Sequence, residues 1–156
     1  MRVKVAFVDL QLPVNGATKF VVGNHPTDCA LDQQLRMPFP TGFDVFGFVP
    51  ADDLGALYAG AEVFCYPSER EGYGLPVLEA MAQGTPVVTS RGTATEEAAG
   101  GAAVLVDPMD PDDIARGITE ARARREMLSD QGVARAGHAT WRETARLTAD
   151  AYRELC

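Results

Sequence analysis

Two glutamates, Glu71 and Glu79, lie eight residues apart in a segment that also contains glycine and proline. Gly72 and Gly74 follow the first glutamate, and glycines let backbone N–H groups approach a ligand closely. Pro76 suits the first turn of a helix, where its missing N–H group costs nothing. The unpaired N–H groups at such a helix start attract phosphate. We therefore expect the loop to bind a diphosphate and the two carboxylates to bind hydroxyl groups.

The composition of the chain limits the classes of protein to which it can belong. With 156 residues and 46% apolar content, the chain is long enough for roughly one domain with a sizeable core. Its net charge of −8 argues against a nucleic-acid surface or an anionic membrane surface, since both attract stripes of Lys and Arg. We therefore expect one domain over residues 1–156 and no nucleic-acid partner.

The cellular setting is also predicted from composition. No stretch reaches the ~18 uninterrupted apolar residues that a membrane span needs, and the chain does not open with a signal peptide. The three cysteines lack the spacing of a metal site or of a disulfide framework, which fits a reduced compartment. The expectation is a cytoplasmic protein with no integral membrane span.

Strand-like and helix-like patterns alternate along the chain. The apolar, β-branched runs predicted as strands are 3–10, 20–23, 44–49, 63–66, 86–90 and 102–106. Helices are predicted over 28–37 and after an N-cap at Asp52 or Asp53. A third is predicted from the loop that contains Gly72 and Gly74, the glycine loop, to Gly84. The others are predicted after a cap at Thr95, from Pro111 towards Leu128, and over 140–156. This alternation predicts parallel βαβ units. We expect an α/β fold, a doubly wound, mostly parallel six-stranded Rossmann-like sheet with helices on both faces, whose ligands lie beyond the carboxyl ends of the strands.

The last predicted helix carries a single apolar stripe. Its members are Trp141, Ala145, Thr148, Tyr152 and Leu155, which recur at spacings of four, three, four and three. Such a period places all of them on one helix face. The stripe therefore needs a surface on which to dock.

The glycine loop also carries a family resemblance. Residues 67–82 read Pro-Ser-Glu-Arg-Glu-Gly-Tyr-Gly-Leu-Pro-Val-Leu-Glu-Ala-Met-Ala, and residues 84–88 read Gly-Thr-Pro-Val-Val. This sequence closely resembles the donor-domain signature of retaining glycosyltransferases of family four, the group-one transferases with the GT-B fold. The similarity covers about residues 20–155. It implies that the chain corresponds to the donor-binding, C-terminal domain of such an enzyme.

The resemblance implies a role for each matching residue. Glu71, the candidate catalytic residue, would face the hydroxyls of the transferred sugar, and Glu79 would hydrogen-bond the donor ribose. The other candidate donor-binding residues are Gly72, Tyr73, Gly74 and Leu75 in the loop, and Phe48, Val49 and Leu54 around the base. The donor would be a UDP-, GDP- or ADP-sugar, with no metal or other cofactor required. Members of the family transfer a hexosyl group to an acceptor hydroxyl, mainly by stabilising the departing diphosphate.

Two departures from the family pattern predict that the isolated chain is inactive. The family's loop after the first strand carries an arginine and a lysine that meet the diphosphate, whereas residues 11–16 contain no basic residue. Lys19 and Arg91 are the nearby basic residues that would compensate in part. The second departure is the missing acceptor domain, on which the terminal helix is expected to dock unless it docks on another copy of the chain.

The first residues add a hypothesis about how the chain arose. Residues 1–17 resemble the opening strand and glycine loop of the missing acceptor domain, so a deletion or fusion would have transplanted this first strand. Two alternatives to a donor-binding domain stay open. One is a stand-alone folding or interaction module that self-associates without activity, and the other is a GT-B-like epimerase of sugar nucleotides. The base, the sugar and the acceptor are not determined by the residues.

Overall fold

The strands form one parallel sheet in the order β3-β2-β1-β4-β5-β6. The computed structural model describes residues 4–7, 18–23, 43–48 and 51–154, and it describes side chains from residue 52 onwards. The strands are β1 (Lys4–Phe7), β2 (Thr18–Gly23), β3 (Phe43–Phe48), β4 (Val63–Tyr66), β5 (Val87–Ser90) and β6 (Ala103–Val106). All five neighbouring pairs are parallel. Side chains are therefore described for β4, β5 and β6.

Helices connect and cover these strands. They are α2 (Ala51–Gly60), α3 (Leu75–Ala82), α4 (Ala94–Ala99), α5 (Pro111–Ala123), α6 (Arg125–His138) and α7 (Trp141–Glu154). The predicted α/β class, with a parallel sheet and helices between its strands, is confirmed. The helix predicted over 28–37 lies outside the described residues.

Three predicted helix boundaries differ in the structure. Helix α2 begins one residue before Asp52, so Asp52 and Asp53 lie in its first turn and do not cap it. Thr93, with extended backbone at φ −123° and ψ 171°, is the N-cap of α4, so the predicted cap Thr95 falls inside that helix and is buried. The helix from Pro111 does not continue to Leu128, because the chain turns at Arg124 and starts α6.

Packing explains the turn between α5 and α6. Ile118 of α5 and Leu128 of α6 belong to one buried cluster. A continuous helix would separate them by about 15 Å along its axis, at 1.5 Å per residue. Arg124 leaves the helical region at φ −103° and ψ 21°, and its N–H group donates to the Glu120 carbonyl at 3.0 Å. The turn thus lets both helices bury apolar residues in the same core.

Strand β4 is buried on both of its faces. Val63 and Cys65 pack with α5 in one cluster, while Phe64 and Tyr66 pack with α2 and α3 in the other. Each of these four side chains is at most 7% exposed. A strand covered on both faces reads as the continuous apolar run seen here. The core therefore holds the end of β4, and with it the glycine loop, from both sides.

Burial raises the pKa of the Cys65 thiol well above its ordinary value of 9.0. The folded protein then keeps this proton at a pH where the unfolded chain loses it. Because the unfolded state binds fewer protons above pH 9, the free energy of unfolding should fall as pH rises, by up to about 1.4 kcal/mol per pH unit for this group. Urea unfolding followed between pH 7 and pH 10.5 measures this slope. Cys65→Ala is the control: the decline should become shallower, and an unchanged slope would contradict the assignment.

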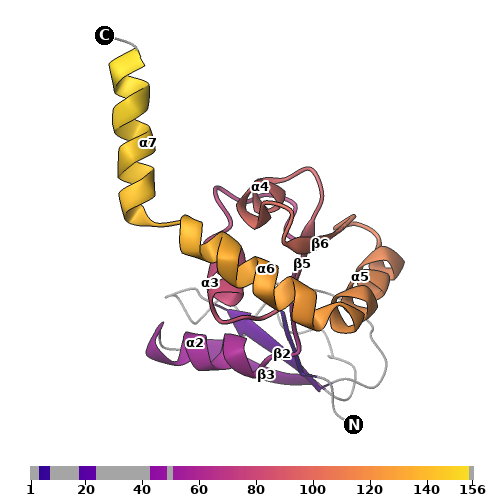
Figure 1. Ribbon diagram of the computed structural model, residues 1–156. Coiled ribbons are helices and arrows are strands. Elements are labelled where there is room, and N and C mark those ends of the chain that lie inside the picture. Colours follow the sequence, from indigo (N-terminus) through magenta and orange to yellow (C-terminus); the bar gives the residue numbers. More distant parts are fainter. Residues whose placement is uncertain (1–3, 8–17, 24–42, 49–50, 155–156) are drawn as a thin grey trace.

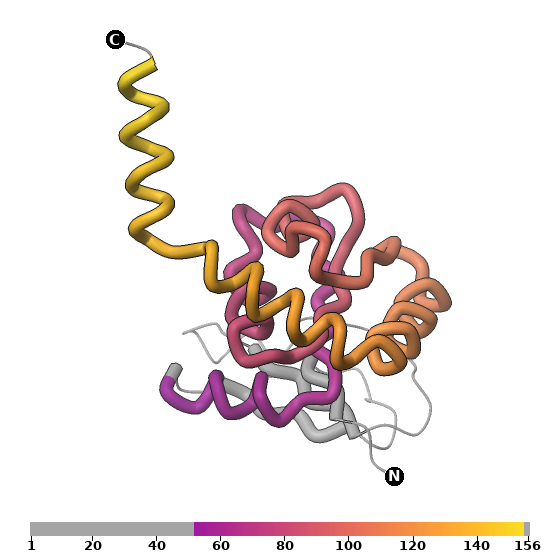
Figure 2. The backbone as a smooth tube through the Cα atoms, in the orientation of Figure 1, coloured from indigo at the N-terminus to yellow at the C-terminus, as the bar shows by residue number. Residues whose placement is uncertain are grey.

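Helix α7 extends away from the rest of the described chain (Figures 1 and 2). None of its residues is buried, and Trp141, Leu147 and Tyr152 are 85%, 54% and 68% exposed. Ion pairs along the helix include one between Arg146 and Asp150 at 2.8 Å. The predicted terminal helix is confirmed, and its apolar stripe has no cover within the described part of the chain. No helix in that part is long and apolar enough to cross a membrane.

Candidate functional site

The glycine loop lies where the order of the sheet reverses. Strands β1 and β4 are neighbours, and the chain runs outward from them in both directions. In doubly wound sheets, ligands bind beyond the carboxyl ends of the strands at such a switch point. Residues 67–74 leave the carboxyl end of β4 and lead into α3. This loop, which contains Glu71 and leads into the helix that carries Glu79, is therefore at the position where this fold binds ligands.

The loop presents backbone donors at the start of α3. Gly74 is the N-cap, with φ 93° and ψ 36°, and Pro76 lies in the first turn as predicted. The Val77 N–H group donates to the Gly74 carbonyl at 3.1 Å. Within the described part of the chain, no hydrogen bond uses the N–H groups of Gly72, Tyr73 or Gly74. These N–H groups, together with the positive end of the helix dipole, can bind an anion.

Glu71 is half-buried beside the end of β4. Its Oε1 accepts a hydrogen bond from the Tyr66 hydroxyl and lies 3.5 Å from Ser68 Oγ. Tyr66 is only 7% exposed, so the glutamate accepts this hydrogen bond from a residue of the core. The carboxylate is thereby fixed at the rim of the sheet.

Glu79 is held in a similar way on α3. The hydroxyl of the buried Tyr58 donates to Glu79 Oε2 at 3.1 Å, although the glutamate itself is exposed. Burial, followed by the adjacent Glu79 carboxylate, raises the pKa of Tyr58 above its ordinary value of 10.0. The phenol therefore stays protonated at neutral pH and remains a hydrogen-bond donor. The structure thus gives each of the two glutamates a tyrosine partner.

Helix α4 packs against the glycine loop. A Cβ atom added to Gly74 would lie 3.2 Å from the Thr95 Cα atom and 3.2 Å from the Ala98 Cβ atom, so α4 touches the loop directly. Before α4, the Gly92 N–H group donates to Glu96 Oε2 at 2.5 Å. Arg91 Nη2 donates to the Leu105 carbonyl at 3.1 Å. This contact ties Arg91, predicted to compensate for the missing basic residues, to the edge strand β6.

The remaining predicted site residues have different surroundings. Tyr73 and Leu75 are 55% and 51% exposed in the loop region. Leu54 is half-buried and packs against the cluster that contains Tyr58. Phe48 is the last residue of β3, where the backbone alone is described, and Val49 lies outside the described residues. The base-binding role predicted for these last three residues therefore stays a prediction.

The partners Tyr58 and Tyr66 were not predicted from the sequence. Tyr58 lies 21 residues before Glu79, on a different helix, and no motif spacing links them. Tyr66 lies five residues before Glu71 but ends a strand, where an aromatic residue is ordinary core. Only the packing of α2 and α3 on β4 reveals that both hydroxyls point at the glutamates.

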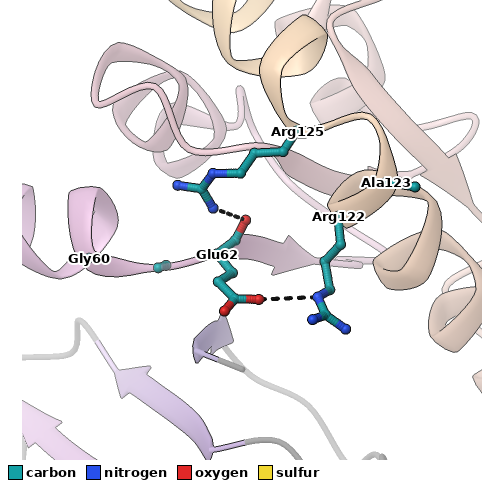
Figure 3. A pocket seen from close by; sticks show the side chains of 6 residues that line it. Gly60, Glu62, Arg122, Ala123 and Arg125 are labelled. Atoms are coloured by element: carbon teal, nitrogen blue, oxygen red, sulfur yellow. Dashed lines mark hydrogen bonds and ion pairs between the residues drawn. The ribbon is translucent and has the colours of Figure 1, made fainter. Parts of the chain in front are cut away.

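A pocket in the described part of the chain lies at the other end of β4. Its lining includes Glu62, Arg122 and Arg125 (Figure 3). Arg122 Nε lies 3.1 Å from Glu62 Oε2, and Arg125 Nη1 donates to the Glu62 carbonyl at 2.9 Å. Glu62 precedes β4, whereas the glycine loop follows it. These contacts join the α5–α6 turn to the amino end of the strand, away from the candidate site.

The chain is similar to known proteins both in sequence and in fold. O-antigen chain mannosyltransferase B of Escherichia coli is 42% identical over 112 residues, which make up 70% of this chain and 29% of the relative. Anabaena HepE, solved in complex with UDP-glucose, superposes with a TM-score of 0.70 at 21% identity, over 88% of this chain and 44% of HepE. The UDP-forming trehalose-phosphate synthase of Burkholderia vietnamiensis gives a TM-score of 0.75 at 15% identity, over 98% of this chain and 45% of the synthase.

These matches cover only part of each known protein. The chain spans less than a third of the mannosyltransferase and less than half of either solved structure. The two structural likenesses show a shared fold. The sequence model of the glycosyl transferases group 1 matches residues 6–123, which include both glutamates and the strands and helices around them. The chain therefore belongs to the glycosyl transferases group 1 family.

Proposed function

We propose that this chain is the domain of a retaining glycosyltransferase that binds a nucleotide-diphosphate sugar, and that it does not transfer the sugar alone. The observation that carries the proposal is the pair of positioned carboxylates on either side of a loop with unpaired N–H groups at the start of α3. The N–H groups suit the diphosphate, Glu79 suits the ribose hydroxyls, and Glu71 suits the hydroxyls of the sugar.

Known relatives support the choice of ligands to examine first. The relative from E. coli is named as a mannosyltransferase, and Anabaena HepE was solved with UDP-glucose. A hexose linked to a nucleoside diphosphate is therefore the class of donor we assign to this chain. The small share of each relative that the chain covers supports the second half of the proposal, since transfer also needs a surface that binds the acceptor.

Calorimetric titration of the chain with UDP, GDP and ADP tests the proposal. We expect saturable binding of one nucleotide, weak because residues 11–16 supply no cation to the diphosphate. Glu79→Ala should weaken this binding by about 10-fold or more, since a hydrogen bond to a charged group contributes about 1.5–3 kcal/mol. Glu126→Ala is the matched control, because Glu126 is an exposed glutamate in the first turn of α6.

Two outcomes would contradict the proposed function. The first is an absence of saturable binding to all three nucleotides. The second is equal affinity for the wild-type chain and Glu79→Ala, which would place the nucleotide elsewhere. An assay with UDP-glucose and GDP-mannose, with and without sugar acceptors, completes the test. Turnover as fast as that of a two-domain enzyme would overturn the view that the chain is insufficient, and conversion of the donor without an acceptor would indicate an epimerase.

We also infer that α7 packs on the remainder of a two-domain enzyme. The match to the trehalose-phosphate synthase covers 98% of this chain, so nearly all of α7 lies within it, and the synthase is about twice as long. The exposed Trp141 and Tyr152, which the helical period places on one face, supply an apolar surface for such a contact. In the isolated chain this face is then uncovered.

Removal of α7 tests this inference with the chain alone. The free energy of unfolding of a chain that ends at Thr140 should lie within about 0.5 kcal/mol of that of the full chain, because α7 buries none of its own residues. Hydrogen exchange should also be fast along α7, since an uncovered helix of this length is marginal in water. If sedimentation shows a dimer that Tyr152→Asp or the truncation dissociates, a second copy covers α7 and the inference is wrong.

A further inference from the structure

Two buried tyrosines reach the two glutamates from the same core cluster. Tyr58 of α2 and Tyr66 of β4 are each 7% exposed, and both belong to the cluster beneath α3. The Tyr58 hydroxyl donates to Glu79 at 3.1 Å, and the Tyr66 hydroxyl donates to Glu71. Each carboxylate is thus anchored from the protein interior, although Glu71 is only half-buried and Glu79 is exposed.

The backbones of both tyrosines are held by buried threonines. Thr85 Oγ1 donates to the Tyr58 carbonyl at 2.6 Å, and Thr89 Oγ1 donates to the Tyr66 carbonyl at 2.9 Å. Thr85 and Thr89 are 2% and 0% exposed. Buried, satisfied hydrogen bonds of this kind restrict the motion of the groups that they join. Each tyrosine is therefore fixed both at its carbonyl group and at its hydroxyl group.

Phe64 connects the two tyrosines. Its ring meets the Tyr58 ring edge to face, with centroids 5.1 Å apart and planes at 86°. The same ring stacks on Tyr66, with centroids 5.7 Å apart and planes at 15°. Both are favourable arrangements for aromatic pairs. One aromatic row therefore runs beneath the site, and its two outer hydroxyls set the separation of the two carboxylates.

We propose that Tyr58 and Tyr66 are positioning residues that orient Glu79 and Glu71 toward the ligand. The tyrosines occupy Glu79 Oε2 and Glu71 Oε1, and within the described part of the chain no bond uses Glu79 Oε1 or Glu71 Oε2. These two oxygens accept the ligand hydroxyls: Glu79 Oε1 those of the ribose, and Glu71 Oε2 those of the sugar. This assignment rests on the proposed function, which supplies the ligand.

The first test needs no ligand. NMR of chain labelled at the tyrosine Cζ carbon reports how fast each hydroxyl proton exchanges with solvent. We expect slow exchange at Tyr58 and Tyr66, and fast exchange at the exposed Tyr73. Glu79→Ala should speed exchange at Tyr58 alone, and Glu71→Ala should speed it at Tyr66 alone. Fast exchange at both tyrosines in the wild-type chain would overturn the proposal, whatever the chain binds.

The second test separates the two subsites with UDP and UDP-glucose, or with GDP and GDP-mannose if GDP is the nucleotide that binds. Tyr58→Phe should weaken binding of the nucleotide and of its sugar derivative equally, by about 5- to 10-fold. Tyr66→Phe should leave the nucleotide unaffected and weaken only the sugar derivative. In the Glu79→Ala background, Tyr58→Phe should have no further effect, because the tyrosine acts through that carboxylate.

Ile114→Val controls for a general loss of stability. Ile114 is buried in the other core cluster, so this substitution should lower stability without changing either affinity. An equal loss of affinity in Ile114→Val and Tyr58→Phe would make the tyrosine merely structural and would overturn the proposal. A chain that shows the expected exchange pattern but binds no nucleotide would retain the anchored carboxylates and refute both the ligand assignment and the proposed function.

Discussion

Gly74→Ala is expected to lower the free energy of unfolding by about 2–3 kcal/mol and to weaken nucleotide binding. The backbone at φ 93° is one that residues with a Cβ atom rarely adopt, at a cost of about 1–2 kcal/mol. In addition, the new methyl group would lie 3.2 Å from the Thr95 Cα atom, and a backbone atom inside α4 cannot move aside easily. Such crowding adds about 1 kcal/mol or more.

Gly92→Ala separates these two contributions. Gly92 also has a positive φ, 75°, but nothing lies within 4 Å of the place where its Cβ atom would be. Its substitution should therefore lower the free energy of unfolding by the backbone cost alone, about 1–2 kcal/mol. The difference between the two variants measures how closely the glycine loop packs on α4. Urea unfolding at pH 7 gives both values.

The binding of nucleotides should distinguish the same two variants. Gly74 precedes α3, and a shift of its backbone moves the N–H groups that we assign to the diphosphate. We expect about 10-fold weaker binding in Gly74→Ala and little change in Gly92→Ala, measured well below the unfolding temperature of each. A Gly74→Ala chain as stable as Gly92→Ala, with unchanged affinity, would show that the loop does not depend on its close contact with α4.

Local signals in the sequence were sufficient to predict where the glycine loop ends and α3 begins. Pro76 cannot donate a backbone hydrogen bond and so favours the first turn, and Gly84, towards which the helix was predicted to run, follows the C-cap Gln83 with a positive φ of 72°. The turn at Arg124 has no such signal, because neither glycine nor proline interrupts the sequence there. It follows from the burial of Ile118 and Leu128 in one cluster, a contact that a pattern along the chain does not reveal.

In the candidate site, the position of the two glutamates could be predicted, but their hydrogen-bond donors could not. The spacing of Glu71 and Glu79 identified the two carboxylates and placed them around the start of a helix, as the structure has them. The donors that hold them could not be predicted, since Tyr58 reaches Glu79 only through the packing of α2 beside α3. Contacts between different elements, which a pattern within one element does not reveal, thus account for the features that were not predicted, both in the fold and in the site.

Phe64→Ala is the substitution with the largest expected effect on stability. Phe64 is fully buried and lies between Tyr58 and Tyr66, so its removal leaves a cavity and breaks both aromatic contacts. Truncation of a buried phenylalanine lowers the free energy of unfolding by about 3–5 kcal/mol, against a total of about 5–15 kcal/mol for a typical domain. Chemical unfolding, extrapolated to water, measures the loss.

Leu128→Ala makes the Phe64 result informative about the site. Leu128 is 1% exposed in the opposite cluster, and its truncation should lower stability by about 2–5 kcal/mol. Both variants are then destabilised, but only Phe64→Ala loosens the row that holds the two glutamates. At a temperature where both remain folded, nucleotide affinity should fall in Phe64→Ala and persist in Leu128→Ala. Equal affinities would mean that the aromatic row supports the core without transmitting its order to Glu71 and Glu79.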